Sequence, residues 1–234
     1  MHHRTASSTS APITIVWDWN GTLRADLADH VAALNATLPA LGRTEPITVE
    51  TYQALHRMPI RDFYTDVLGR ALDDEEWHAA DTAFLAELNR RPVRLQPGAR
   101  QLMMGLRARG VRQSLLSLAP HERLVTEVGQ AGITGLLERV DGRPGPSVPS
   151  KAPAMAAHLQ ALGPWVDPAR TLVIGDSVDD AVAARAVGAV PVLHTGGLHG
   201  AARLATAGVP LVDTLQEAVA LGIALITEQQ LAAA

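Results

Sequence analysis

The sequence predicts an α/β fold with a mainly parallel sheet, and three observations lead to this prediction. Short apolar runs alternate with helical segments from residue 111 onward, which is typical of βα units whose sheet is covered on both faces. The apolar run at residues 13–17 ends directly on Asp18, and the run at 171–174 is followed shortly by Asp176. Hydrophobic residues make up 47% of the 234 residues, which is enough for a substantial core.

The first half of the chain predicts one strand and then only helices. The strand covers residues 13–17, and helices follow over residues 25–41, 49–55, 60–68 and 74–88. Acidic residues at 73–76 suit the positive end of the dipole of the last of these helices. Residues 24–91 are therefore predicted to form an all-helical insertion between two core segments, 12–23 and 92–222.

The sequence pattern of the second half predicts the remaining strands and helices of the core. A helix over residues 99–109 follows the Pro97-Gly98 pair and ends at Gly110. Strands are expected over residues 111–116, 137–140, 171–174, 190–193 and 209–212, and helices over 121–131, 152–162, 179–187, 201–207 and 215–221. Residues 142–150 contain three prolines and predict a loop. Residues 1–11 are predicted to be a disordered leader, and residues 223–234 form an Ala-rich tail without a clear pattern.

The composition excludes several classes of function. A net charge of −4, from 24 acidic and 20 basic residues, argues against a general nucleic-acid surface. No apolar run is long enough to cross a membrane. The chain has no cysteine, which excludes disulfides, thiolate metal sites and cysteine nucleophiles, and which fits a cytoplasmic protein. No feature of the sequence indicates a protein partner.

Two aspartates follow predicted strands and are candidates for chemistry. Asp18 comes at the carboxyl end of a buried strand, where open α/β sheets bind their ligands. A carboxylate there can attack phosphorus or bind a metal, although a lone aspartate can also cap a loop. Asp176 and Asp180 lie four residues apart across a strand–helix turn, and with Asp18 they offer the all-oxygen ligands that suit Mg²⁺. The alternative is that Asp179 and Asp180 cap the following helix.

Two further residues gain meaning from these carboxylates. Ser117 directly follows the strand predicted over residues 111–116, which by itself indicates a turn or a helix cap. Lys151 is the only lysine in the chain. A lysine is a compact charge suited to a phosphate or a carboxylate in a tight site, whereas an isolated lysine is ordinarily solvated.

In combination these motifs resemble those of a known family. The order Asp-x-Asn-Gly-Thr at residues 18–22, Ser117, Lys151 and Gly-Asp-Ser-x-x-Asp at residues 175–180 is similar to that of the haloacid dehalogenase-like hydrolase superfamily. Its phosphoglycolate-phosphatase and β-phosphoglucomutase branch is the most similar. The resemblance runs from residue 13 to about residue 221. It implies a three-layer Rossmann-like core, with the helical insertion as a cap domain.

The resemblance also implies a mechanism. Asp18 would attack phosphorus and form an aspartyl-phosphate, and Mg²⁺ would be held by Asp18, the backbone carbonyl of Asn20, Asp176 and Asp180. Phosphate oxygens would be bound by Ser117 and Lys151, with Gly21 and Thr22 completing the phosphate-binding loop. The implied activity is a Mg²⁺-dependent phosphatase acting on a small phosphorylated metabolite.

The sequence departs from the family pattern at Asn20. Phosphatases of this family carry an aspartate there, which protonates the leaving oxygen and then activates water. An amide cannot transfer a proton, and general acid–base catalysis contributes about 10²–10⁴-fold, so a slow enzyme is expected. His56, His121 or a leaving group that needs no proton would have to compensate. The alternatives are a catalytically impaired phosphate-binding or scaffold protein of the same fold and, less favoured, a mutase.

Three observations bear on chemistry at the insertion and at Asn20. The insertion contains no lysine, which argues against the Schiff-base chemistry of phosphonate-cleaving relatives. Arg57 and Arg61 could contact an anionic substrate, although exposed arginines on a solvated helix face are the ordinary case. The Asn20-Gly21 sequence is prone to deamidation, which would generate an aspartate at position 20.

Overall fold

The computed structural model describes residues 12–57, 59–145, 148 and 150–233, and its core is built on one parallel sheet. The strand order is β3-β2-β1-β4-β5-β6, and each neighbouring pair is parallel. This is the Rossmann order, in which β2 and β3 lie on one side of β1, and β4, β5 and β6 lie on its other side. The predicted fold class is therefore confirmed. The strands are β1 (Thr14–Trp17), β2 (Arg112–Pro120), β3 (Val140–Arg143), β4 (Thr171–Gly175), β5 (Val190–His194) and β6 (Leu211–Val212). The leader predicted at residues 1–11 lies outside the described residues.

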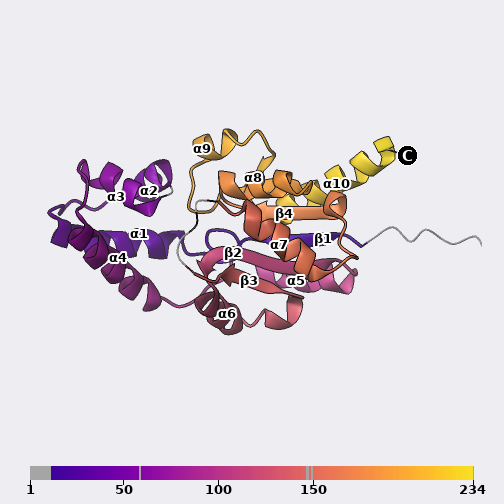
Figure 1. The fold of residues 1–234 in the computed structure, drawn as a ribbon, viewed down its shortest axis with the longest axis horizontal. Helices are drawn as coiled ribbons and strands as arrows, with labels where there is room; N and C mark the ends of the chain where they lie inside the picture. The colour runs from indigo at the N-terminus through magenta and orange to yellow at the C-terminus, as the bar shows by residue number, and fades with distance from the viewer. Residues whose placement is uncertain (1–11, 58, 146–147, 149, 234) are drawn as a thin grey trace, which may run out of the picture.

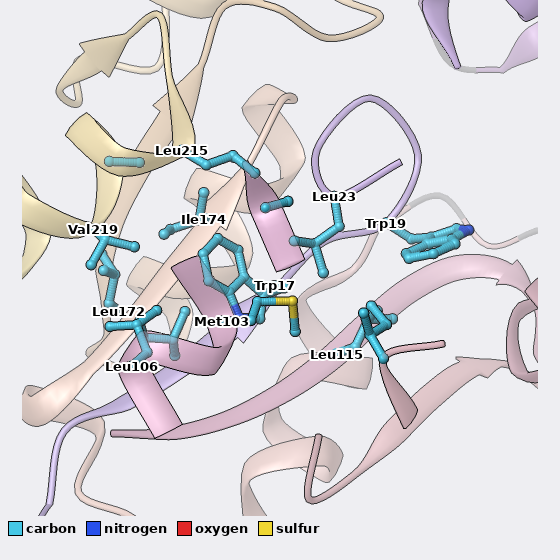
Figure 2. Packing of buried hydrophobic residues seen from close by; sticks show 14 of the residues in the cluster. Trp17, Trp19, Leu23, Met103, Leu106, Leu115, Leu172, Ile174, Leu215 and Val219 are labelled. Atoms are coloured by element: carbon cyan, nitrogen blue, oxygen red, sulfur yellow. The ribbon is translucent and has the colours of Figure 1, made fainter. Parts of the chain in front are cut away.

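Alternate side chains of the sheet enter two separate cores. In β1, Ile15 and Trp17 belong to one buried cluster and Val16 to another, as the two-residue period of a strand requires. Trp17 lies in register with Leu115 of β2 and Ile174 of β4, and Figure 2 shows it within the first cluster. That cluster contains residues of α5 (Ala99–Ala108), α6 (His121–Gln130) and α10 (Leu215–Ala233). The second contains residues of α7 (Ala152–Leu162) and α8 (Val178–Ala186), which completes three layers.

The helical insertion has a hydrophobic core of its own. It contains α1 (Leu27–Thr37), the 3-10 turn η1 (Leu38–Leu41), α2 (Val49–Leu55), α3 (Ile60–Leu68) and α4 (Asp74–Asn89), grouped at one end of the molecule in Figure 1. Its buried cluster includes Leu34, Tyr52 and Phe63. The single helix predicted over residues 25–41 is divided, because Pro39 lacks the N–H group that an α-helix would need there.

Two short chain segments join the insertion to the core, and they are hydrogen-bonded to each other. The backbone N–H of Ala25 donates to the carbonyl of Arg94 at 2.8 Å, and that of Gln96 donates to the carbonyl of Leu23 at 2.8 Å. Both crossings are therefore fixed at one place. We propose domain boundaries near residues 24 and 91 on this basis.

The loop at residues 195–200, between β5 and α9 (Ala201–Ala205), connects the core to the insertion a second time. Leu198 is buried within the hydrophobic cluster of the insertion, although it belongs to the core part of the chain. The side-chain amide of Gln53 in α2 donates to the carbonyl of Gly197 at 2.7 Å, and the N–H of Gly200 donates to the carbonyl of Gln53 at 3.1 Å. The insertion therefore packs directly on a loop at the carboxyl edge of the sheet.

The largest differences from the predicted bounds concern β2, β3 and α10. Strand β2 continues to Pro120, past the end predicted at residue 116. Strand β3 covers Val140–Arg143 and not residues 137–140, and residues 137–139 connect it to the turn η2 (Thr134–Leu136). The helix predicted over residues 215–221 continues as α10 to Ala233, because Ile226 packs into the core. Within the described residues, no helix combines the length and the apolar character needed to span a membrane.

Candidate active site

Three carboxylates meet at the carboxyl edge of the sheet. Asp18 directly follows β1, Asp176 directly follows β4, and Asp180 lies in the first turn of α8. Because β1 and β4 are adjacent and parallel, their ends reach the same edge, at the reversal of strand order where open α/β sheets bind ligands. One carboxylate oxygen from each of the three lies within 4.8 Å of the others. The structure therefore brings together the three aspartates that the sequence analysis grouped.

Lys151 lies between two of these carboxylates. Its Nζ is 2.5 Å from Oδ1 of Asp18 and 2.6 Å from Oδ1 of Asp180, and its side chain is buried. The backbone N–H of Lys151 donates to Oδ2 of Asp179 at 2.7 Å, so Asp179 fixes the start of α7 from which the lysine side chain extends. Asp179 therefore does more than cap its own helix, because its carboxylate also binds the backbone of α7.

The electrostatics of the cluster favour a cation. Burial raises the pKa of Asp18 to about 7, and the negative charges of Asp180 and Asp176 add to this effect, while Lys151 opposes it. Burial also acts against charge on Lys151, but Asp18 and Asp180 outweigh it and hold the pKa of the lysine above its usual value. Three carboxylates face one ammonium group, so a divalent cation would balance the charge. An all-oxygen ligand set of this kind fits Mg²⁺.

Close packing around Asp176 leaves room only for glycine beside it. Gly21 has a φ of +72°, and a Cβ atom there would lie 2.1 Å from Oδ2 of Asp176. That oxygen also accepts a hydrogen bond from the N–H of Leu198 at 2.5 Å. The loop after β1 therefore lies against Asp176, and Gly21 is required for this approach.

Asp180 has two functions at once. Its Oδ2 accepts hydrogen bonds from the N–H and the hydroxyl of Ser177 at 3.1 and 2.6 Å, in the capping box of α8. Its Oδ1 faces Lys151. Asp180 therefore caps α8 through Oδ2 and contacts Lys151 through Oδ1, and its predicted part in metal binding stays a prediction.

Ser117 lies within β2 and not after its end. The pairing of β2 with β3 is irregular between Leu116 and Pro120, and the N–H of Ala119 donates to Oγ of Ser117 at 3.2 Å. The side chain is buried at the same edge of the sheet as Asp18. Its predicted contact with phosphate stays a prediction.

Asn20 is held by a residue that the sequence analysis did not identify. The Nδ2 group of Asn20 donates to Oδ2 of Asp26 at 2.6 Å, and the N–H of Gly21 donates to Oδ1 of Asp26 at 2.8 Å. Burial opposes the charge of Asp26, but His30, Asn20 and Arg24 outweigh it and hold the pKa of this carboxyl below its usual value. A single aspartate at the start of a helix carries no sequence signal for such a role.

The hydrogen bonds of this loop bear on the predicted phosphate contacts. The N–H of Gly21 is used by Asp26, and the N–H of Thr22 donates to the carbonyl of Trp19 at 3.2 Å. The Thr22 side chain is fully buried, and its hydroxyl has no hydrogen-bond partner in the part of the chain described. In the structure Gly21 and Thr22 therefore shape the loop after β1, and their predicted part in phosphate binding stays a prediction.

The two histidines considered as proton carriers lie in different places. His56 is buried in the insertion, and its Nδ1 is 3.2 Å from Nε2 of His199, whose Nδ1 lies 3.8 Å from Oδ2 of Asp176. Burial and the neighbouring His199 lower the pKa of His56 well below its usual value. His121 accepts a hydrogen bond from the N–H of Gly142 at 3.1 Å. Sequence reasoning missed His199, because a histidine in a Gly-rich loop follows no motif.

The two arginines considered for substrate binding are paired inside the insertion. Nε of Arg57 lies 2.6 Å from Oδ2 of Asp66, and NH1 of Arg61 lies 2.7 Å from Oδ1 of Asp74. Both pairs are solvent-accessible and of modest strength. The arrangement agrees with a solvated helix face.

Comparisons with known proteins match most of this chain in sequence and in fold. The sequence profile of the haloacid dehalogenase-like hydrolases matches residues 14–188. Phosphoglycolate phosphatase of Synechococcus elongatus is 28% identical over 191 residues, which are 79% of this chain and 84% of that protein. A predicted phosphoglycolate phosphatase from Haemophilus somnus superposes with a TM-score of 0.71 at 18% identity, over 91% of this chain and 99% of that one. A HAD family hydrolase from Deinococcus radiodurans, crystallised with bound phosphate and sodium, gives a TM-score of 0.67 at 23% identity, over 92% and 98% of the two chains.

Proposed function

The chain belongs to the haloacid dehalogenase-like hydrolases, and from this membership we propose that it is a Mg²⁺-dependent phosphatase of a small phosphorylated metabolite. The observation that carries the proposal is the contact of Lys151 with Asp18 and Asp180 beside Asp176. An attacking carboxylate, a balancing cation and further metal ligands are what phosphoryl transfer through an aspartyl-phosphate requires.

In this proposal Asp18 is the nucleophile. One oxygen of Asp18 forms a bond to phosphorus while the bond from phosphorus to the leaving oxygen breaks, and water then cleaves the aspartyl-phosphate to release phosphate and restore Asp18. Lys151 and Ser117 bind phosphate oxygens, and Lys151 offsets charge beside Asp18. Asp18, Asp176, Asp180 and the backbone carbonyl of Asn20 would hold Mg²⁺, which supplies charge stabilisation at the transferred group.

The leaving oxygen receives no proton from Asn20, because an amide cannot give one up. The proposal therefore expects slow turnover of alkyl phosphates, whose leaving alkoxide needs a proton, and faster turnover of esters with acidic leaving groups. The same residue supports the second candidate function, a phosphate-binding protein of the same fold with little or no turnover. The two functions differ in whether bound phosphate ester is cleaved.

Phosphoglycolate is the first substrate to assay, because the Synechococcus relative carries that activity in its name. We propose a cytoplasmic location, in line with the absence of cysteine.

The test is phosphate release from phosphoglycolate, sugar phosphates, nucleotides and p-nitrophenyl phosphate, with Mg²⁺ and with excess chelator. We expect release that depends on Mg²⁺ and is lost in Asp18→Asn. Beryllofluoride, which mimics the aspartyl-phosphate, should raise the melting temperature of the native protein but not of the variant. Stabilisation by beryllofluoride without turnover would favour the binding protein. If neither phosphate release nor stabilisation is observed, both candidate functions are rejected.

A further inference from the structure

We propose that Asp26 is a positioning residue that fixes the amide of Asn20, so that the two side chains act as one amide–carboxylate pair. The consequence for the reaction rests on the proposed function, whereas the pairing itself does not. A carboxylate at position 20 would become an effective proton carrier only when position 26 changes with it.

The orientation of Asp26 is the first support. Asp26 is the N-cap residue of α1, yet its side chain makes no capping hydrogen bond to its own helix. Both carboxylate oxygens instead point back to the loop after β1, Oδ2 to the Asn20 amide and Oδ1 to the N–H of Gly21. A polar side chain at this position ordinarily caps the helix. Here the carboxylate of Asp26 binds the loop after β1 and not its own helix.

The surroundings of Asp26 are the second support. Its side chain is fully buried, and the basic side chains that face it place Nε of Arg24 at 3.5 Å and Nε2 of His30 at 3.3 Å. Arg24 is shared, because its NH1 donates to Glu127 at 2.8 Å. The Asn20 amide therefore supplies the shortest of the contacts that Oδ2 makes. Replacing that donor by an acceptor would leave the buried carboxylate of Asp26 without its closest hydrogen bond.

This arrangement determines what a single substitution at position 20 can achieve. Asn20→Asp, which reproduces the residue typical of relatives, would place a carboxylate oxygen where Nδ2 now lies, 2.6 Å from Oδ2 of Asp26. That distance suits a donor and an acceptor, and the substitution would replace the donor by a second acceptor. The introduced side chain could not keep the position in which Asp26 now holds the Asn20 amide.

Exchanging both residues preserves the hydrogen bonds. With Asn20→Asp and Asp26→Asn together, the new side-chain amide at position 26 donates to the new carboxylate at position 20. Its carbonyl oxygen still accepts from the N–H of Gly21. The carboxyl group at position 20, in its protonated form, can then give its proton to the leaving oxygen as the bond from that oxygen to phosphorus breaks, and the resulting carboxylate recovers a proton from the attacking water.

The test compares the native protein, Asn20→Asp, Asp26→Asn and the double variant on an alkyl phosphate and on p-nitrophenyl phosphate. We expect the double variant to cleave the alkyl phosphate about 10²-fold or more faster than the native protein, with Asn20→Asp alone gaining less than about tenfold. The gain on p-nitrophenyl phosphate should be much smaller, because its leaving group needs no proton. A change in the folded fraction alone would change the cleavage rates of both substrates by the same factor.

The matched control is Asn20→Asp combined with Asp29→Asn. Asp29 is a buried carboxylate in the same helix, but it pairs with Arg94 at 3.0 Å and does not contact Asn20. This control has the same net charge as the exchanged pair, and we expect no gain in alkyl phosphate cleavage from it. A gain as large as that of the exchanged pair would overturn the proposal, as would a full gain from Asn20→Asp alone.

Melting temperatures test the pairing independently of activity. Asn20→Asp should lower the melting temperature by about 4 °C or more, and Asp26→Asn should recover at least half of that loss. Additive shifts would overturn the pairing. If no variant cleaves any ester while the shifts are coupled, the proposed function fails and the pairing stands.

Discussion

The ammonium nitrogen of Lys151 lies 2.5 Å from Oδ1 of Asp18, and the lysine is buried together with both of its acidic partners. Lys151→Met should destabilise the protein by about 3–5 kcal/mol, because it leaves buried carboxylates without their cation. Denaturant unfolding measures the loss, and Mg²⁺ should restore part of it if the carboxylates bind the metal.

The control for this prediction is Lys151→Arg, which keeps the charge. We expect a smaller loss of stability and a partial loss of activity, since the planar guanidinium is larger than an ammonium group. Equal stability of the Met and native proteins would show that the ion pairs contribute little.

A second prediction concerns the dependence of stability on pH and involves His158, away from the carboxylate cluster. His158 is buried, with Nδ1 2.7 Å from Asp141 and Nε2 2.9 Å from Oγ of Ser114. Burial lowers the pKa of His158 from its ordinary value of 6.5, against the raising effect of Asp141. His158 therefore binds a proton more readily in the unfolded chain than in the folded protein. The free energy of unfolding should fall as the pH drops below about 6.5.

The substitution His158→Gln should reduce that slope by up to about 1.4 kcal/mol per pH unit, the value for one proton. Urea unfolding at several pH values between about 5 and 8 measures it. The control is His78→Gln, which removes an exposed histidine. A slope that is the same in both variants would contradict the assignment.

The third prediction uses the close approach of α10 to the sheet. Gly222 lies within this helix, and a Cβ atom there would be 2.3 Å from Cδ1 of the buried Leu172. Gly222→Ala should therefore destabilise the protein by about 1–3 kcal/mol through overpacking, although alanine ordinarily favours a helix. Gly105→Ala in α5 is the control, since the nearest atom is 3.8 Å away, and it should stabilise by up to about 1 kcal/mol. Thermal unfolding of both variants should give shifts of opposite sign.

The fourth prediction concerns deamidation of Asn20. This reaction requires the backbone nitrogen of Gly21 to attack the side-chain carbonyl carbon of Asn20. In the structure that N–H donates to Asp26, and the Asn20 amide is bound to the same carboxylate. We therefore expect deamidation to be slow in the native protein and faster in Asp26→Ala. Peptide mass spectrometry during storage measures the converted fraction, and equal rates in the two proteins would contradict the protective role.

Strand periodicity and parallel connections predicted the α/β class and the meeting of Asp18, Asp176 and Asp180 at one edge of the sheet, and the family resemblance added Lys151 to them. The sequence could not predict that Asp26 turns away from its own helix toward Asn20, or that His199 lies beside Asp176. Those contacts depend on loop conformations and on the docking of the insertion, which no local pattern encodes. The sequence did not predict the continuation of α10 to Ala233, because the Ala-rich segment has no clear pattern and only its packing against the sheet identifies its buried side.

Leu198 is carried by the loop after β5, yet it completes the hydrophobic cluster of the helical insertion, while its backbone N–H binds Asp176. The insertion is continuous in sequence, but it is not a self-contained module. Recombination that transplanted residues 24–91 into a relative would transfer most of the cluster and leave one of its side chains behind. A functional chimera would need the matching 195–200 loop as well, so the two segments should be inherited as a unit although more than a hundred residues separate them.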